Sequence, residues 1–238
     1  MYRELAPPPD LAPYLACVWS SVHRGGVIFP DGCVDLVWHG TRVLVAGPAT
    51  GPVDPSIGVG QPVHGVRFRL GVAGTALGLP AGELADETVP VAELWGDWVD
   101  ERVAAGGMPA LLEIVRERLR GVAIDPLARA AALGMADPGA RVDELGAALG
   151  VSERQLRRRF ADAVGYGPAT LVRVLRFQRF LHRANAPDAA GAPLARLAAE
   201  AGYADQAHLA RECRRLAGLP PSALLAYGAA PAGEPRRR

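Results

Sequence analysis

Two stretches of the chain place arginines where they could bind a polyanion. The first, "GVSERQLRRRFADAVGYGP", begins at Gly150 and has the apolar periodicity of a short amphipathic helix. At about 100° per residue, Leu156 and Phe160 share one face and Arg158 points almost directly away from them. An outward arginine can donate two hydrogen bonds to a guanine edge or neutralise a phosphate. For a lone helix, however, a plain solvated face is the simpler interpretation.

The second stretch, "GYADQAHLARECRRLAGLPP", begins at Gly202 and repeats the same layout. Ahead of the glycine the two copies align at an offset of 52, and after it they align at an offset of 53. A one-residue slip in a turn, with both flanks in step, indicates a duplicated helix-turn-helix unit. The glycine supplies the positive φ that such a turn requires. Two aligned copies with arginines outward therefore favour recognition helices that enter the major groove. The matched pairs are 142/194, 145/197, 146/198 and 150/202, then 156/209, 158/211, 160/213, 165/218 and 168/221.

The outward positions of the two second helices are the candidate DNA contacts. The inward positions are predicted to be Leu156, Phe160, Ala163 and Val164 in the first copy, and Leu209, Cys213, Leu216 and Ala217 in the second. The outward or flanking positions are Arg154, Gln155, Arg157 and Arg158 in the first copy, and His208, Arg211, Arg214 and Arg215 in the second.

Charge is distributed unevenly along the 238 residues. Residues 1–140 hold 10 Arg and 16 acidic residues, whereas residues 141–238 hold 16 Arg and 9 acidic residues, so a net charge of −6 is followed by one of +7. The basic half is suited to a polyanionic partner. Three cysteines without CxxC spacing favour neither a disulfide framework nor a zinc finger. Without a signal peptide or a run of about 18 apolar residues, we expect a cytoplasmic protein with no membrane partner.

The period of the apolar residues changes near Gly82. Before it, short runs bounded by Gly, Pro and Asp are typical of strands: "LACVWSSV", "VIFP", "CVDLVWHG", "RVLVAG" and "VHGVRFRLG". After it, "VAELWGDWVDERV", "PALLEIVRERL" and "DPLARAAALGM" have helical spacing. Pro138 and Gly139 mark a linker where the charge changes sign.

Residues 141–228 resemble the DNA-binding domain of the AraC/XylS family of bacterial transcriptional regulators. The family pattern G-x-S-x-x-x-L-x-R-x-F is matched by Gly150, Ser152, Leu156, Arg158 and Phe160. The pattern of the second unit is matched by Gly202, Tyr203, Asp205, Gln206, Leu209, Arg211, Arg214 and Arg215, and its closing G-x-x-P by Gly218 and Pro221. The resemblance implies two units joined by one long helix, here 168–184, and base-reading positions at Arg154, Arg157, Arg158, Gln206, His208 and Arg211.

Three residues depart from the family pattern. Ala204 replaces a frequent capping serine, so Asp205 is expected to cap the helix. Cys213 replaces a core phenylalanine and should pack less tightly. Ala207 is too short for a base contact, so the second unit is expected to read fewer base pairs than the first.

The N-terminal half resembles, more distantly, the cupin-like sensor domains found ahead of this module. We therefore expect an α+β multidomain protein with a small β-barrel and trailing helices over 1–135, which senses an effector or dimerises. A linker over 136–141 leads to the double helix-turn-helix domain over 142–228, and a disordered basic tail occupies 229–238. The expected partners are double-stranded promoter DNA, RNA polymerase, a small-molecule effector and a second copy of the chain, and activation of transcription is one expected outcome.

Few N-terminal residues suggest chemistry of their own. Asp31, Cys33, Asp35 and His39 tempt a metal assignment, but "PDG" favours a hairpin turn, so we expect no metal and no cofactor. Arg67 and Arg69 could bind an anionic effector, but the wet face of a strand is the preferred interpretation. The alternative function is a DNA repair or modifying enzyme that uses Cys17 and Cys33. Such domains need a zinc-bound tetrad of cysteines, so we expect a regulator and not an enzyme.

Overall fold

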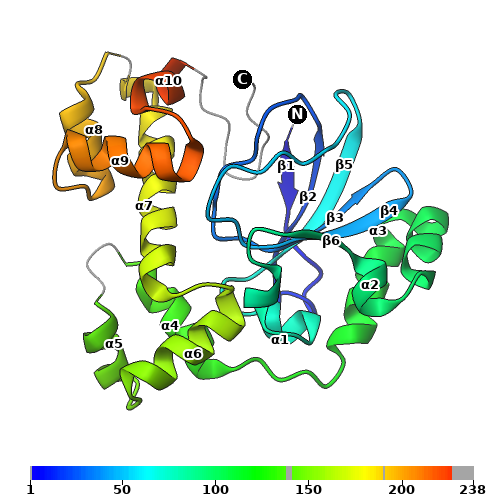
Figure 1. Ribbon diagram of the computed structural model, residues 1–238. Coiled ribbons are helices and arrows are strands. Elements are labelled where there is room, and N and C mark those ends of the chain that lie inside the picture. Colours follow the sequence, from blue (N-terminus) through cyan, green and yellow to red (C-terminus); the bar gives the residue numbers. More distant parts are fainter. Residues whose placement is uncertain (1, 138–140, 190, 227–238) are drawn as a thin grey trace.

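The computed structural model describes residues 2–137, 141–189 and 191–226. An antiparallel sheet with its own helices forms the N-terminal part, and an all-helical region forms the C-terminal part (Figure 1). The expected α+β class is therefore confirmed. Part of the expected linker and the expected tail from residue 229 onward lie outside the described residues, and the limits of the domains stay a prediction.

Six strands form one antiparallel sheet in the order β1-β2-β5-β3-β4-β6. Among the described residues the edge strands β1 and β6 do not pair with each other, so the sheet is open and not closed into a barrel. Each edge strand has only three residues, too few to continue the ladder around. The strands are β1 (Arg3–Leu5), β2 (Leu15–Val22), β3 (Asp35–His39), β4 (Arg42–Ala46), β5 (Pro62–Phe68) and β6 (Thr88–Pro90). "VIFP" forms no strand, and its Ile28 makes an isolated bridge with Val53.

The two faces of the sheet have different neighbours because side chains alternate along each strand. Leu36, Val66 and Phe68 belong to the apolar core shared with the N-terminal helices. The opposite face carries Trp19 and Arg67, which line a cavity. The helices of the first core are α1 (Ala73–Leu77), the 3₁₀ helix η1 (Ala81–Leu84), α2 (Val91–Trp95) and α3 (Trp98–Leu119), which is broken at Gly107 with φ of 63°.

The C-terminal region has a second apolar core around α7. Its helices are α4 (Pro126–Met135), α5 (Val142–Ala148), α6 (Glu153–Val164), α7 (Pro168–Ala184), η2 (Pro187–Ala189), α8 (Leu194–Ala201), α9 (Gln206–Ala217) and α10 (Pro221–Ala226). Helix α7 has the bounds expected for the connecting helix. Helix α4, which the sequence placed with the N-terminal part, buries Ala128, Ala131 and Met135 in this second core. None of the described helices is long and apolar enough to cross a membrane.

Candidate nucleic-acid interface and N-terminal cavity

Helices α5 and α6 form the first helix-turn-helix unit. Gly150, with φ of 67°, makes the turn between them. Ser152 accepts a hydrogen bond from the backbone N–H of Gln155, and the Gln155 side chain accepts one from the backbone N–H of Ser152, so α6 begins with a capping box. The buried residues of α6 are Leu156, Phe160, Ala163 and Val164, which confirms the predicted inward face.

The outward face of α6 is basic. Arg154, Arg157 and Arg158 are exposed to solvent. Arg157 pairs with Glu153 one turn earlier at 2.5 Å, whereas Arg154 and Arg158 have no ion-pair partner among the described residues. Gln155 is exposed, and its side-chain oxygen is engaged in the capping box, which leaves its amide nitrogen as a donor.

Helices α8 and α9 form the second unit. Gly202, with φ of 86°, ends α8. Asp205 caps α9 by accepting a hydrogen bond from the backbone N–H of His208 at 2.6 Å, as expected from the loss of a serine at position 204. The buried residues of α9 are Leu209, Cys213, Leu216 and Ala217, which again confirms the predicted inward face.

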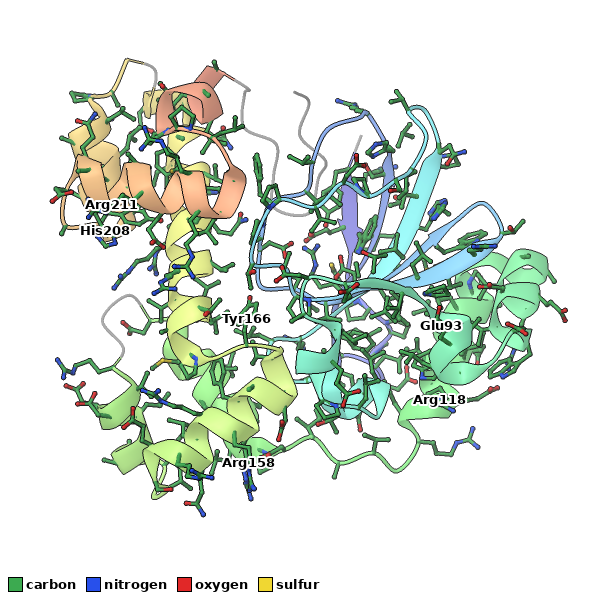
Figure 2. All side chains as sticks on the ribbon, viewed as in Figure 1. Glu93, Arg118, Arg158, Tyr166, His208 and Arg211 are labelled. Atoms are coloured by element: carbon green, nitrogen blue, oxygen red, sulfur yellow. The ribbon has the colours of Figure 1, made fainter. Side chains whose placement is uncertain are left out.

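The outward face of α9 has a more varied set of side chains than that of α6. Gln206, Arg211, Arg214 and Arg215 are exposed, and the three arginines have no ion-pair partner among the described residues. His208 is half-buried, because its ring packs edge-on against Tyr203 with centroids 5.2 Å apart. Figure 2 shows Arg158 at one end of α7 and His208 with Arg211 at the other.

Helix α7 adds two arginines that the sequence reading missed. The Nε atoms of Arg176 and Arg179 are buried and have no hydrogen-bond partner among the described residues. Burial and the neighbouring Arg176 charge lower the pKa of Arg179, and the opposing charges of Tyr203 and Asp137 offset this shift only in part. The spacing of Arg173, Arg176 and Arg179 in threes could have indicated one basic stripe along the helix.

The first unit also packs against the N-terminal part. A Cβ atom on Gly74 in α1 would lie 2.1 Å from the carbonyl oxygen of Asp162 in α6, so only glycine permits this approach. At the end of α6, a Cβ atom on Gly165 would lie 2.9 Å from the carbonyl oxygen of Ala81 in η1. Tyr166 follows directly and lies at the junction of the two parts (Figure 2).

A loop before β3 packs against α7. Phe29 packs edge-on against Phe177 with ring centroids 5.9 Å apart. Gln178 donates a side-chain hydrogen bond to the carbonyl oxygen of Pro30 at 2.5 Å. Residues 27–33 therefore connect the sheet domain to the helix that holds both units.

A cavity lies between this loop and the outer face of the sheet. It holds Arg67 at its base, 8% exposed, so the expected wet strand face is wrong at this position. Arg69 is half-buried, and its Nε donates a hydrogen bond to the carbonyl oxygen of Ala12 at 2.6 Å. The alternation of β5 was read correctly, but covering loops bury the face that carries Arg67.

Three carboxylates surround the Arg67 guanidinium. Asp35 accepts from its Nε at 3.0 Å and from its Nη2 at 2.9 Å. Asp31 lies 3.4 Å from Nη2 and Glu4 lies 3.7 Å from Nη1. Burial raises the pKa of the Asp35 carboxyl, and the charge and bidentate hydrogen bonds of Arg67 counter only part of this shift.

The two cysteines near the Arg67 guanidinium have little thiolate character. Burial raises the pKa of Cys17 to about 11, and burial with the Asp31 charge raises the pKa of Cys33 well above its ordinary value. His39 does not line the cavity that contains Asp31, Cys33 and Asp35. Among the described residues, no group of three or more His, Cys, Asp or Glu side chains is arranged to hold a metal ion.

Residues 145–227 match the family described as "Helix-turn-helix domain", a segment that contains α6 to α9 complete. Residues 3–90 match a domain family of unknown function, DUF6597. No curated protein matches the chain significantly in sequence.

Two solved structures of ToxT from Vibrio cholerae are similar to the chain at low identity. ToxT from strain O395 has a TM-score of 0.45 and 10% identity, and covers 88% of this chain and 95% of that chain. ToxT from strain SCE256 with a bound unsaturated fatty acid has a TM-score of 0.41 and 9% identity, with 87% and 93% covered. These similarities are too distant for any functional residue to be carried over.

Proposed function

We propose that the chain binds promoter DNA with both helix-turn-helix units at once. Residues 145–227 form a helix-turn-helix domain of the AraC type, so the chain is a DNA-binding transcription regulator of the AraC/XylS type. The observation that carries this proposal is the pair of recognition helices, each with its apolar face buried and its arginines exposed. The proposed contacts are Arg154, Gln155, Arg157 and Arg158 of α6, and Gln206, His208, Arg211, Arg214 and Arg215 of α9.

The two units should read different sequences. The proposed base-reading side chains differ between the two helices, and different side chains pair with different base edges. They are Arg154, Arg157 and Arg158 in α6, and Gln206, His208 and Arg211 in α9. One chain would therefore occupy a non-palindromic site with two unlike boxes. We place the boxes in successive major grooves on one face of the duplex, about 34 Å apart, because α7 fixes the spacing.

Arg176 and Arg179 have a supporting role in this proposal. Their buried Nε atoms lie on α7 between the two recognition helices and lack partners among the described residues. A phosphate of the DNA segment between the two boxes would place a further anion beside these two arginines.

Footprinting of the full chain on selected DNA tests the proposal. Insertion of about five base pairs between the boxes would turn one box to the far side of the duplex, and binding should fall to that of a single box plus non-specific contacts. A symmetric footprint, or tolerance of the half-turn insertion, would contradict the geometry.

The N-terminal domain is proposed to control this binding through a small-molecule effector, with RNA polymerase as the partner at the promoter. The cavity against Arg67 supports a ligand, and the loop 27–33 supports its connection to α7. We also propose a homodimer through this domain, because β1 is an exposed edge strand and Leu5 is 68% exposed. Sedimentation velocity of the Leu5→Arg variant tests the dimer: a monomer is expected where the unmodified chain is a dimer.

A further inference from the structure

The N-terminal cavity has the lining of a small-molecule site. The cavity has a volume of about 100 Å³ and opens to solvent. Its walls are largely apolar, with Trp19, Ile28, Phe29, Val37, Leu44 and Val63 among them. Ligand sites in proteins are usually apolar pockets with a few polar groups that orient the occupant.

Ser21 and His23 each bring to the cavity wall a buried polar atom without a hydrogen-bond partner among the described residues. Ser21 and His23 are 7% and 4% exposed, and the Ser21 Oγ and His23 Nδ1 atoms make no hydrogen bond among the described residues. Both residues line the cavity. Buried polar atoms in native proteins are nearly always paired, so these two atoms indicate an occupant with hydrogen-bonding groups of its own.

The charge of the cavity selects the class of occupant. Four carboxylates line it (Asp31, Asp35, Asp86 and Glu87) against the single guanidinium of Arg67. Arg67 is already held by Asp35 and Asp31, with Glu4 at 3.7 Å, and has no positive charge to spare. An anionic occupant would have to displace these carboxylates or lie beside them.

Asp31 is a carboxylate of the lining that has hydrogen-bonding capacity left for an occupant. Both oxygens of Asp35 are used by Arg67. In Asp31, Oδ1 accepts from the backbone N–H of Cys33 at 2.9 Å, and Oδ2 lies at the longer distance of 3.4 Å from Arg67. Trp19 and Phe29 add aromatic rings to the lining, and such rings attract cations.

We propose that this cavity binds a small organic cation, an amine or amidine on an apolar body, with its charged group beside Asp31. Binding itself does not require the chain to be a regulator. The consequence of binding does rest on the proposed function. The loop 27–33 lines the cavity with Asp31 and Cys33 and contacts α7 through Phe29 and Pro30, so an occupant would act on operator binding through that helix.

Three probes of one shape and different charge test the proposal on the full chain without DNA. They are 2-phenylethylamine, 2-phenylethanol and phenylacetate, and titration calorimetry measures their binding. The amine is expected to bind most tightly, and phenylacetate should bind at least about tenfold more weakly because its charge has the same sign as the lining carboxylates. Phenylacetate binding as tightly as the amine, or no heat from any probe, would overturn the proposal.

An Asp31→Asn variant locates the charged group. The asparagine side chain keeps an oxygen for the Cys33 N–H, so the loop turn should survive while one negative charge is lost. Amine binding should weaken by about tenfold, with little change for 2-phenylethanol. Asp97→Asn removes a carboxylate that does not line the cavity and should leave all three affinities unchanged. If Asp31→Asn binds the amine as tightly as the unmodified chain does, the charged group of the occupant does not lie beside Asp31.

The outcome is separable from that of the DNA-binding proposal. Operator footprints without any probe report on the two units alone. If the amine does not bind, the footprints are unchanged. If the chain gives no footprint, the affinity of the cavity for the amine can still be measured by calorimetry.

Discussion

The first helix-turn-helix unit is built into the body of the molecule, whereas the second is attached mainly to α7. Helix α6 packs against α1, η1 and α4, and the close approach of Gly74 to the Asp162 carbonyl leaves no room for a side chain. Helices α8 and α9 contact α7, each other and α10, and they lie at the far end of α7 in Figure 1. Two copies of one motif therefore differ in what holds them in place.

Their interiors differ as well. At the matched core position, α6 has Phe160 and α9 has Cys213, both fully buried. Helix α6 begins with a reciprocal capping box, whereas α9 begins with one carboxylate cap. The first unit is therefore held by more of the molecule than the second, and we expect the second unit to be displaced more easily.

The largest expected effect comes from the matched core positions. Phe160→Ala should lower the free energy of unfolding by about 3–5 kcal/mol, because it removes a large buried ring. Cys213→Ala removes one sulfur atom and should cost only about 1 kcal/mol. Urea denaturation of both variants measures the difference. If Phe160→Ala does not fold, Phe160→Leu replaces it, because leucine keeps most of the side-chain volume. Phe160→Leu should still cost more stability than Cys213→Ala. Equal costs at the two positions would show that the two cores are packed alike.

The second prediction concerns the contact between α1 and α6. Gly74→Ala should destabilise the chain by about 1–3 kcal/mol, because the new methyl group meets the Asp162 carbonyl. Hydrogen exchange should increase in α6 and stay unchanged in α9. Gly51→Ala is the control, since its Cβ atom would meet nothing within 4 Å. Faster exchange in α9 to the same extent would remove the distinction between the units.

The third prediction compares the two recognition faces. Arg158→Ala and Arg211→Ala should each cost about 1–3 kcal/mol of specific DNA binding if the side chains contact base edges. Each variant should relax specificity in its own box only, as measured by selection of bound sequences. The thermal midpoint should hardly change, because both side chains are exposed. Arg196→Ala in α8 is the control arginine. Unaltered operator affinity in both variants would contradict the proposed contacts.

The smallest effects are expected at the caps. Ser152→Ala and Asp205→Ala each remove the acceptor for a backbone N–H and should cost about 1 kcal/mol of stability. Thermal denaturation followed by circular dichroism measures both. Asp205→Asn retains an acceptor and should recover most of the loss. If Asp205→Ala is neutral, the N-terminus of α9 is satisfied by other means.

Periodic features of this fold were predictable from the sequence. The inward faces of α6 and α9 follow from apolar spacing, and the bounds of α7 follow from the family resemblance. The repeat supplies a second copy for comparison. The apolar spacing in the sequence was therefore enough to predict the two helices that carry the candidate DNA contacts.

Features that depend on what covers a surface were not predictable. Alternation in β5 put Arg67 on one face, but only the loops of residues 23–33 and 47–57, which have no apolar period, turn that face into a cavity wall. Helical spacing in α4 showed one apolar side without showing that its partner is the C-terminal core. The requirement for glycine at position 74 comes from a carbonyl 88 residues away in the chain.

The length of α7 has a consequence for how such a regulator can diverge. Adding one residue inside this helix would rotate the second unit by about 100° and advance it by about 1.5 Å, so both boxes could no longer be engaged together. Substituting an exposed residue of α6 or α9 changes the bases read and leaves this phase intact. Descendants of this protein should therefore acquire new box sequences in single steps, while the distance between the boxes is inherited unchanged.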